Sequence, residues 1–417
     1  MTCVPRLPAI PRTLNALGRA AASFGLRPGS LDPDSLEAEA RRQTGLGNFG
    51  DGPYRDGLGR LTDALEAEAE LSALGRFITR GDLVRLLGNR LQLTDWHERN
   101  PEIGQRPVRS PIFIVGQGRT GTTILHELLA LDPANRVPQT WEAEFPFPPP
   151  ERAEYERDPR IARSQSEIDR SESLIPDFKR MHRMGAQLPQ ECVRITAAAF
   201  KSAIFTAQWR IPSYTRWLLR DADMASAYAY HRKTLQLLEW RCPGERWILK
   251  SPGHLWCPEA VLAAYPDARL IQTHRDPLRI LSSLSSLEVV LRKLTSDAIS
   301  VEEIAREWSE WLTLAYERSV NFREKGTLPA SQVIDLQFQE FIADPLAVVR
   351  RIYERFDLEL RPETEKRMQD YILNNPSDRD GAHRHRLENT GLDIDEERAK
   401  VARYQKYFDV PTEDSGA

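Results

Sequence analysis

Apolar residues follow two different patterns along the chain, one before about residue 108 and one after it. In the first part they recur every three or four residues, a period typical of amphipathic helices. We expect a short helix over 14–24 and longer helices over 57–76 and 80–96. Residues 1–108 are therefore interpreted as a helical N-terminal extension.

Beyond this extension, short apolar runs alternate with helical periodicity. Four runs predict buried strands, at 112–115, 247–249, 270–273 and 333–336. The helices expected between and after them span 122–131, 161–174, 225–241, 258–265, 277–294, 301–323 and 345–356. Strands separated by helices are typical of a parallel sheet with helices on both faces. We expect an α/β domain over 109–376 and a C-terminal segment over 377–417.

Composition and charge exclude several classes of protein. The chain has 417 residues, of which 41% are hydrophobic, and a net charge of −4, so it is neither a disordered chain nor a globally basic nucleic-acid binder. Its four cysteines form no CxxC pair or Cys/His cluster, which argues against a disulfide framework or a zinc site. We find no apolar run long enough for a membrane helix and no signal-peptide pattern, and we expect a cytoplasmic protein.

The sharpest motif follows the first predicted strand. Residues 116–123 read Gly-Gln-Gly-Arg-Thr-Gly-Thr-Thr, and a predicted helix begins at their end. A glycine-rich turn between a strand and a helix presents backbone N–H groups to an anion. The loop has the glycines and the last threonine of a Walker A loop, but Thr122 stands where that loop has its lysine. Arg119 lies within the turn and supplies a cation instead.

Two further strands end in cations. Arg275 follows the predicted strand 270–273, and Ser283 lies eight residues later, about two turns into a helix. Lys250 ends the strand 247–249, and His254 follows on the loop. Because ligands of parallel sheets bind at the carboxyl ends of the strands, we expect a second anion site at Arg275 and a catalytic group near Lys250.

Together these three segments resemble the sulfotransferases that use 3′-phosphoadenosine 5′-phosphosulfate (PAPS). The branch they resemble is the bacterial type with the loop R-[TS]-G-T-T, and the resemblance spans about 110–410. It implies a P-loop-like α/β fold, PAPS as co-substrate without a metal, and transfer of a sulfuryl group to a hydroxyl or amine of an unidentified acceptor. It also implies that 377–417 closes over the cofactor.

The resemblance implies cofactor contacts in the glycine-rich loop, at the second anion site and in a basic C-terminal run. The residues it points to are Gly118, Arg119, Thr120, Gly121, Thr122, Thr123, Arg275, Ser283, Arg384 and Arg386.

For catalysis, the resemblance implies that Lys250 and Arg119 stabilise charge on the transferring group. Two residues remain open as the base that takes the acceptor's proton. His254 lies in the K-x-P-x-H-L element, and Glu142 follows the loop by about twenty residues, where other members of the family have a glutamate. Further candidates on the acceptor side are Glu191 and His182.

Two alternatives are a P-loop kinase or NTPase, and a degenerate nucleotide-binding protein without activity. The missing Walker lysine and the lack of a clear magnesium-binding aspartate disfavour the first, and the retained cations disfavour the second. The acceptor classes left open include small molecules, glycans and lipids. We expect no nucleic-acid partner and no integral membrane segment, and the N-terminal extension allows a homodimer contact.

Overall fold

The computed structural model describes residues 7–24, 29–176, 178–181, 183–375 and 387–413 of the chain. The predicted cofactor contacts Arg384 and Arg386 lie outside the described residues. So does His182.

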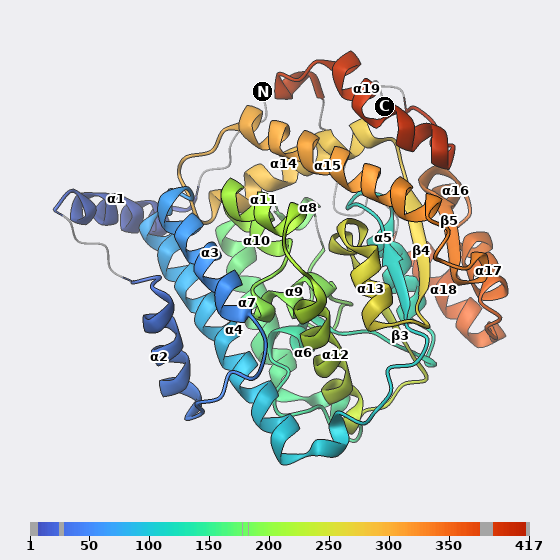
Figure 1. Ribbon diagram of the computed structural model, residues 1–417, viewed down its shortest axis with the longest axis horizontal. Helices are drawn as coiled ribbons and strands as arrows, with labels where there is room; N and C mark the ends of the chain where they lie inside the picture. The colour runs from blue at the N-terminus through green and yellow to red at the C-terminus, as the bar shows by residue number, and fades with distance from the viewer. Residues whose placement is uncertain (1–6, 25–28, 177, 182, 376–386, 414–417) are drawn as a thin grey trace.

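Five parallel strands form one sheet in the order β2–β3–β1–β4–β5 (Figure 1). The strands are β1 (Ile112–Val115), β2 (Asn135–Arg136), β3 (Arg246–Ser251), β4 (Arg269–His274) and β5 (Val333–Gln337). The predicted α/β class and all four predicted strands are confirmed. The two-residue strand β2 was not predicted, because so short a segment carries no hydrophobic pattern.

Both faces of the sheet are buried. In β1, Ile112 and Ile114 belong to one apolar cluster and Phe113 and Val115 to another. Alternate side chains of a strand point to opposite faces, so helices on both sides require this continuous apolar run. One face packs on α5 (Thr122–Ala130), α16 (Phe338–Ala343), α17 (Pro345–Arg355) and α18 (Pro362–Asn374). The other packs on α12 (Ala225–Trp240), α13 (Pro258–Ala264), α14 (Pro277–Lys293) and α15 (Val301–Glu324).

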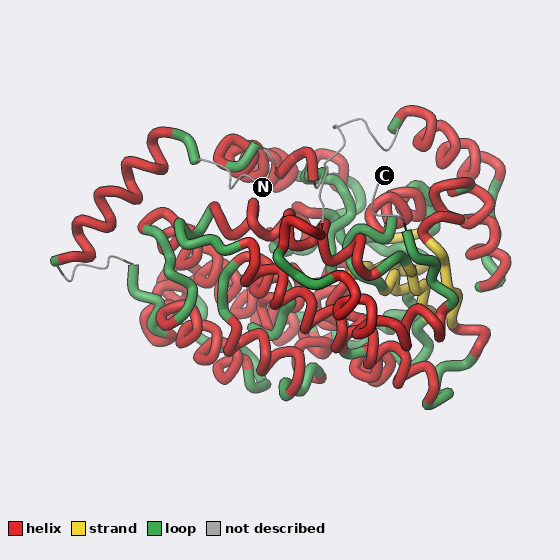
Figure 2. Tube along the Cα trace, turned by 90° about the horizontal axis from the view of Figure 1, so that it is seen from above, coloured by secondary structure: helices red, strands yellow, loops and turns green. Residues whose placement is uncertain are grey.

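Shorter elements fill the long connection between β2 and β3 and the C-terminal end. The helices are α6 (Thr140–Glu144), α7 (Pro159–Leu174), α8 (Phe178–Met181), α9 (Cys192–Thr196), α10 (Ile204–Gln208), α11 (Pro212–Arg220) and α19 (Ile394–Phe408). Single 3₁₀ turns are η1 (Pro101–Ile103), η2 (Tyr155–Arg157), η3 (Ala197–Ala199), η4 (Pro252–Trp256), η5 (Ala330–Gln332) and η6 (Leu387–Thr390). Figure 2 shows that helices make up most of the described chain and that the strands are gathered at one end.

The N-terminal extension is helical, as predicted, but its helices have other bounds. They are α1 (Ala9–Ser23), α2 (Pro33–Thr44), α3 (Tyr54–Ala67) and α4 (Ala73–Arg99). The break expected between residues 76 and 80 lies instead at 68–72, where the Ser72 hydroxyl accepts a hydrogen bond from Gly75 N and begins α4. Gly75 is needed for packing, since a Cβ there would lie 1.9 Å from the carbonyl oxygen of Thr295.

Candidate functional site

The carboxyl ends of three neighbouring strands meet at the centre of the sheet. β1 lies between β3 and β4, with Ile114 opposite Lys250 and Val115 opposite Gln272. The chain leaves β1 toward one edge of the sheet and later adds β4 on the other side, so this is the switch point at which open parallel sheets form a crevice. The glycine-rich loop, the end of β3 and the turn after β4 therefore adjoin one another.

The glycine-rich loop is held in shape by hydroxyl groups. The Thr120 hydroxyl donates to the carbonyl oxygen of Gln117 at 2.7 Å and lies 2.7 Å from the Thr273 hydroxyl on β4. Gly121 has a φ of +84° and immediately precedes the first residue of α5, Thr122. A left-handed residue at this point turns the chain into the helix, and glycine adopts that conformation without strain.

The two predicted anion sites lie together in one region, which we call the corner and which consists of Arg119, Arg275 and Ser283. Arg119 Nε donates to the Ser283 hydroxyl at 3.0 Å, and its Nη1 donates to the carbonyl oxygen of Met181 at 2.9 Å. Arg275 Nη1 donates to the carbonyl oxygen of Arg119 at 2.9 Å. Burial, with a smaller contribution from the charge of Arg275, lowers the pKa of Arg119. An anion that binds in this corner is stabilised by the positive charges of both arginines.

A carboxylate of the chain already occupies part of this corner. Glu413 accepts from Arg275 Nε and Nη2, both at 2.9 Å, and lies 3.8 Å from Arg279 Nε. The ring of Phe338 lies under the Arg275 guanidinium, 3.8 Å from its central carbon. The backbone N–H of Glu413 donates to Asp276 at 2.8 Å, which fixes the carboxylate in position. Arg275 is thus oriented for an oxygen anion held in a two-pronged contact.

A cavity of about 680 Å³ opens beside the loop. Gly118, Arg119, Thr122 and Thr123 of the loop line it together with Lys250 at the end of β3. The Lys250 side chain is only 3% exposed and forms an ion pair with Glu191, which is 23% exposed and also lines the cavity.

Apolar side chains form much of the remaining wall. They come from α7, α8 and α14 and from the N-terminal helix α4, and they include Ile78, Ile168, Ile175, Phe178, Leu287 and Leu291. The N-terminal extension, which we expected to be helical, thus supplies part of the wall through α4. The sequence gives no sign of this, because helical periodicity shows which face of a helix is buried and not what it packs against.

The cavity also carries charged groups that the sequence analysis did not single out. Glu144 accepts hydrogen bonds from Arg194 and is ion-paired with Arg85, and Asp82 pairs with the same two arginines. Burial alone would raise the pKa of Glu144, but the charges of Arg194 and Arg85 lower it. Glu144 and Glu142 share the five-residue helix α6, and no sequence signal tells which of them faces the cavity.

Glu288, another carboxyl group of the cavity, has a raised pKa. Glu288 on α14 is almost completely buried beside Arg292 and accepts a hydrogen bond from the Trp308 indole. Burial raises the pKa of Glu288 to about 8, against the opposing charge of Arg292. A carboxyl group of this kind is largely protonated at neutral pH and is a poor candidate for an ionised base.

The structure places Glu142 away from this cavity. Its side chain is completely buried and receives hydrogen bonds from Arg136 Nη1 at 3.1 Å, from the Tyr155 hydroxyl at 3.0 Å and from Gln139 N at 3.0 Å. These three bonds all go to Oε2, Arg136 Nη2 donates to Oε1 at 2.5 Å, and Glu142 is not among the residues that line the cavity. Its predicted role as the base finds no support in this geometry.

Glu142→Gln is expected to lower the free energy of unfolding by about 3–5 kcal/mol, because the buried Arg136 would lose its charge partner. The transfer rate per folded molecule should stay within about twofold of wild type. Denaturant unfolding followed by circular dichroism measures the first quantity. A large loss of rate without a loss of stability would restore Glu142 as the base.

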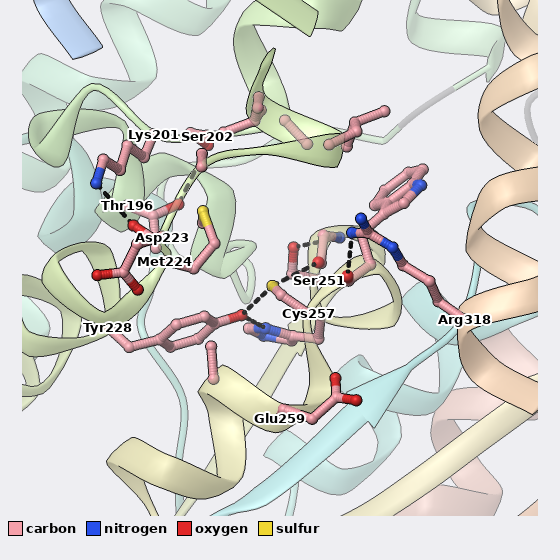
Figure 3. Close-up of a pocket in the computed structure, with 18 of the residues that line it drawn as sticks. Thr196, Lys201, Ser202, Asp223, Met224, Tyr228, Ser251, Cys257, Glu259 and Arg318 are labelled. Atoms are coloured by element: carbon pink, nitrogen blue, oxygen red, sulfur yellow. Dashed lines mark hydrogen bonds between the residues drawn. The ribbon is translucent and has the colours of Figure 1, made fainter. Parts of the chain in front are cut away.

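His254 lies in a second, smaller cavity of about 410 Å³. Its ring is 2% exposed, its Nδ1 lies 2.7 Å from the Tyr228 hydroxyl, and Phe113 packs edge-on against it. Figure 3 shows Tyr228 and the thiol of Cys257 converging in this cavity. Burial lowers the pKa of His254 well below its ordinary value. The lowered pKa makes the ring a weak base, and the glycine-rich loop does not line its cavity, so its predicted role as the base also lacks support.

The comparisons with known proteins agree among themselves. A family model described as "Sulfotransferase family" matches residues 111–362. The crystal structure of sulfotransferase STF1 from Mycobacterium tuberculosis has a TM-score of 0.80 and 32% identity, covering 91% of this chain and 100% of that one. Sulfotransferase STF9 from Mycobacterium avium has a TM-score of 0.84 and 30% identity, covering 93% and 99%.

A curated relative from Mycobacterium bovis, omega-hydroxy-beta-dihydromenaquinone-9 sulfotransferase Stf3, is 26% identical over 265 residues. That match covers 60% of this chain and 63% of the relative. None of the helices described is long and apolar enough to cross a membrane. Within the described residues, no group of three or more His, Cys, Asp or Glu side chains is arranged to hold a metal ion.

Proposed function

This chain belongs to the sulfotransferase family, and we propose that it transfers a sulfuryl group from PAPS to a hydroxyl group of a largely apolar acceptor. The observation that carries the choice of donor is the single corner formed by Arg119, Ser283 and Arg275. It joins a loop suited to a 5′-phosphosulfate with a cation pair suited to a 3′-phosphate. A donor with both groups engages both parts at once.

The residues of the corner fit such a donor. The carboxylate of Glu413 is bound by Arg275 in the geometry that a phosphate oxygen pair needs, which supports the 3′-phosphate assignment. The side chain of Arg119 reaches Ser283 and not the loop interior, so we assign it to the same phosphate. The 5′-phosphosulfate is left to the loop N–H groups, the hydroxyls of Thr122 and Thr123, and Lys250.

In the reaction, the S–O bond to the 5′-phosphate breaks as the acceptor oxygen bonds to sulfur, and the bonding electron pair leaves with the phosphate. Lys250 is buried at the loop, and its ammonium group would neutralise the charge that grows on the leaving oxygen. The loop and the arginines bind and orient the donor. The acceptor's proton must pass to a base during or after the attack.

We assign the base to Glu191. Its carboxylate lines the cavity, contacts Lys250 and is partly exposed, so an acceptor hydroxyl entering the cavity can reach it. Glu144 lines the same cavity but is bound by two arginines, and burial keeps Glu288 largely protonated. The ammonium group of Lys250 lies against the Glu191 carboxylate, beside the reacting groups. When the proton is transferred, the positive charge of Lys250 stays with the leaving phosphate.

An acceptor with a large apolar part fits the wall of the cavity. The volume of about 680 Å³ is that of a sizeable small-molecule site, and isoleucine, leucine and phenylalanine side chains line much of it. One relative is named for a menaquinone-derived acceptor, which agrees with an apolar substrate class. We propose a hydroxylated lipid or quinol-like molecule and leave its identity to screening.

Calorimetric titration of the purified protein tests the donor assignment without an acceptor. Adenosine 3′,5′-bisphosphate should bind clearly in the absence of metal, and more tightly than ATP with magnesium. The reverse preference would favour a P-loop kinase or NTPase. Binding of neither nucleotide would favour a degenerate protein without activity.

Arg275→Ala is expected to weaken binding of adenosine 3′,5′-bisphosphate by about 10–100-fold, because the 3′-phosphate loses a two-pronged charged contact. AMP has no 3′-phosphate, and its affinity should change by less than about threefold. Titration of both nucleotides against both proteins measures the difference. An equal loss for the two nucleotides would mean that Arg275 does not hold the 3′-phosphate.

A further inference from the structure

One buried amide in the glycine-rich loop lacks the partners that a folded protein ordinarily provides. Gln117 is 1% exposed, and neither its Oε1 nor its Nε2 has a hydrogen-bond partner among the residues the structure describes. Its backbone is held in place, since its carbonyl oxygen accepts from Thr120. Gln117 is among the residues that line the cavity, as are Lys250 and Glu191.

Two other buried glutamines of the chain have partners for their amide groups. Gln236 Nε2 donates to the carbonyl oxygens of Gly104 and Arg106, at 3.0 and 2.7 Å. Gln272 Nε2 donates to the Ser319 hydroxyl, and its Oε1 accepts from Arg323. Burying an amide without a partner costs free energy, so such groups are rare in native structures and mark places where something else binds. Gln117, whose amide is buried and unpaired, is one of the residues that line the cavity of the proposed reaction.

We propose that Gln117 binds the transferring sulfuryl group, with Nε2 donating to one of its oxygens. The inference rests on the proposed function. We assign the 5′-phosphate to the loop N–H groups and the hydroxyls of Thr122 and Thr123, whereas Gln117 lies at the other end of the loop, two residues after β1, beside the strand that carries Lys250. The sulfuryl group offers oxygen acceptors only, which match an amide donor. Gln117 is then a specificity residue that distinguishes the loaded donor from its desulfated product.

Gln117→Met removes the amide while keeping the length of the side chain. It is expected to weaken binding of PAPS by about 10–100-fold, the effect of one hydrogen bond to a charged group, and to change the affinity for adenosine 3′,5′-bisphosphate by less than about twofold. Both are measured by calorimetry without an acceptor. The unliganded variant should unfold at the same or a higher temperature than wild type, because an unpaired buried polar group has been removed.

The matched control is Gln236→Met, which removes a buried amide that has its partners. It should lower the unfolding temperature and leave both affinities unchanged. If Gln117→Met lowers the unfolding temperature as the control does, or weakens PAPS and the bisphosphate equally or not at all, the inference is overturned. A wild-type protein that binds neither nucleotide overturns the proposed function, and this inference with it.

Discussion

Lys250→Met is expected to reduce the rate of sulfuryl transfer by about 10²–10³-fold, the effect of removing one well-placed charge stabiliser from a transition state. The ammonium group is buried at the end of β3 and lines the cavity beside the glycine-rich loop, where charge grows on the leaving phosphate. Affinity for the desulfated product should change much less, because Lys250 contributes most while the S–O bond is breaking. Single-turnover transfer to a hydroxylated acceptor found by screening measures the rate.

Lys201→Met is a matched control for this variant. Lys201 is as buried as Lys250, but it lies in the second cavity, and its ammonium group donates to the carbonyl oxygen of Asp223 at 2.7 Å. Both variants lose a buried lysine, so both are expected to lose stability, and only Lys250→Met should lose rate per folded molecule. Equal rates for the two variants would remove Lys250 from the mechanism.

Glu191→Gln is expected to slow transfer by about 10²–10⁴-fold, the range over which a positioned base acts. A glutamine keeps the size of the side chain but cannot take up the acceptor's proton. Single-turnover transfer, with the same acceptor as for Lys250→Met, measures the rate.

The comparison that decides the base uses Glu142→Gln and His254→Ala beside Glu191→Gln. Glu142 is bound in full by Arg136, Tyr155 and Gln139, and His254 faces the second cavity. Glu142→Gln should keep its rate per folded molecule within about twofold of wild type, and His254→Ala should lose no more than a few-fold. An undiminished rate in Glu191→Gln, with a large loss in either of the other two, would transfer the role to that residue.

The parts of the fold that could be predicted are those in which the chain's local pattern and its tertiary environment agree. β1 was predicted residue for residue, since a strand buried on both faces has to be continuously apolar. The glycine-rich loop and the eight-residue spacing of Arg275 and Ser283 are local as well. The break before α4 was misplaced because the predicted helix over 57–76 ran across the Ser72 cap, where the structure begins α4.

The base could not be assigned from the sequence because partners decide it. Glu142 and Glu144 lie on the same short helix, and only the fold shows that one is bound by Arg136 while the other faces the cavity beside Arg194. His254 follows Lys250 by four residues, yet the η4 turn carries it to a different cavity. Gln117 has no sequence signal either, since an unsatisfied amide is recognised only once its surroundings are known.

Under the proposed assignment of Arg275 to the 3′-phosphate, donor binding replaces the Glu413 carboxylate at this arginine with a phosphate. A carboxylate carried on the same chain competes at a high effective concentration, so the measured affinity for a nucleotide is the difference between two charged contacts. The same competition favours release of the nucleotide product, because the Glu413 carboxylate pairs with Arg275 again when the product leaves. Residues fused beyond Glu413 would alter the competition between this carboxylate and the nucleotide. An affinity tag at the C-terminal end is therefore expected to shift the apparent affinity for the nucleotide without contacting the cavity.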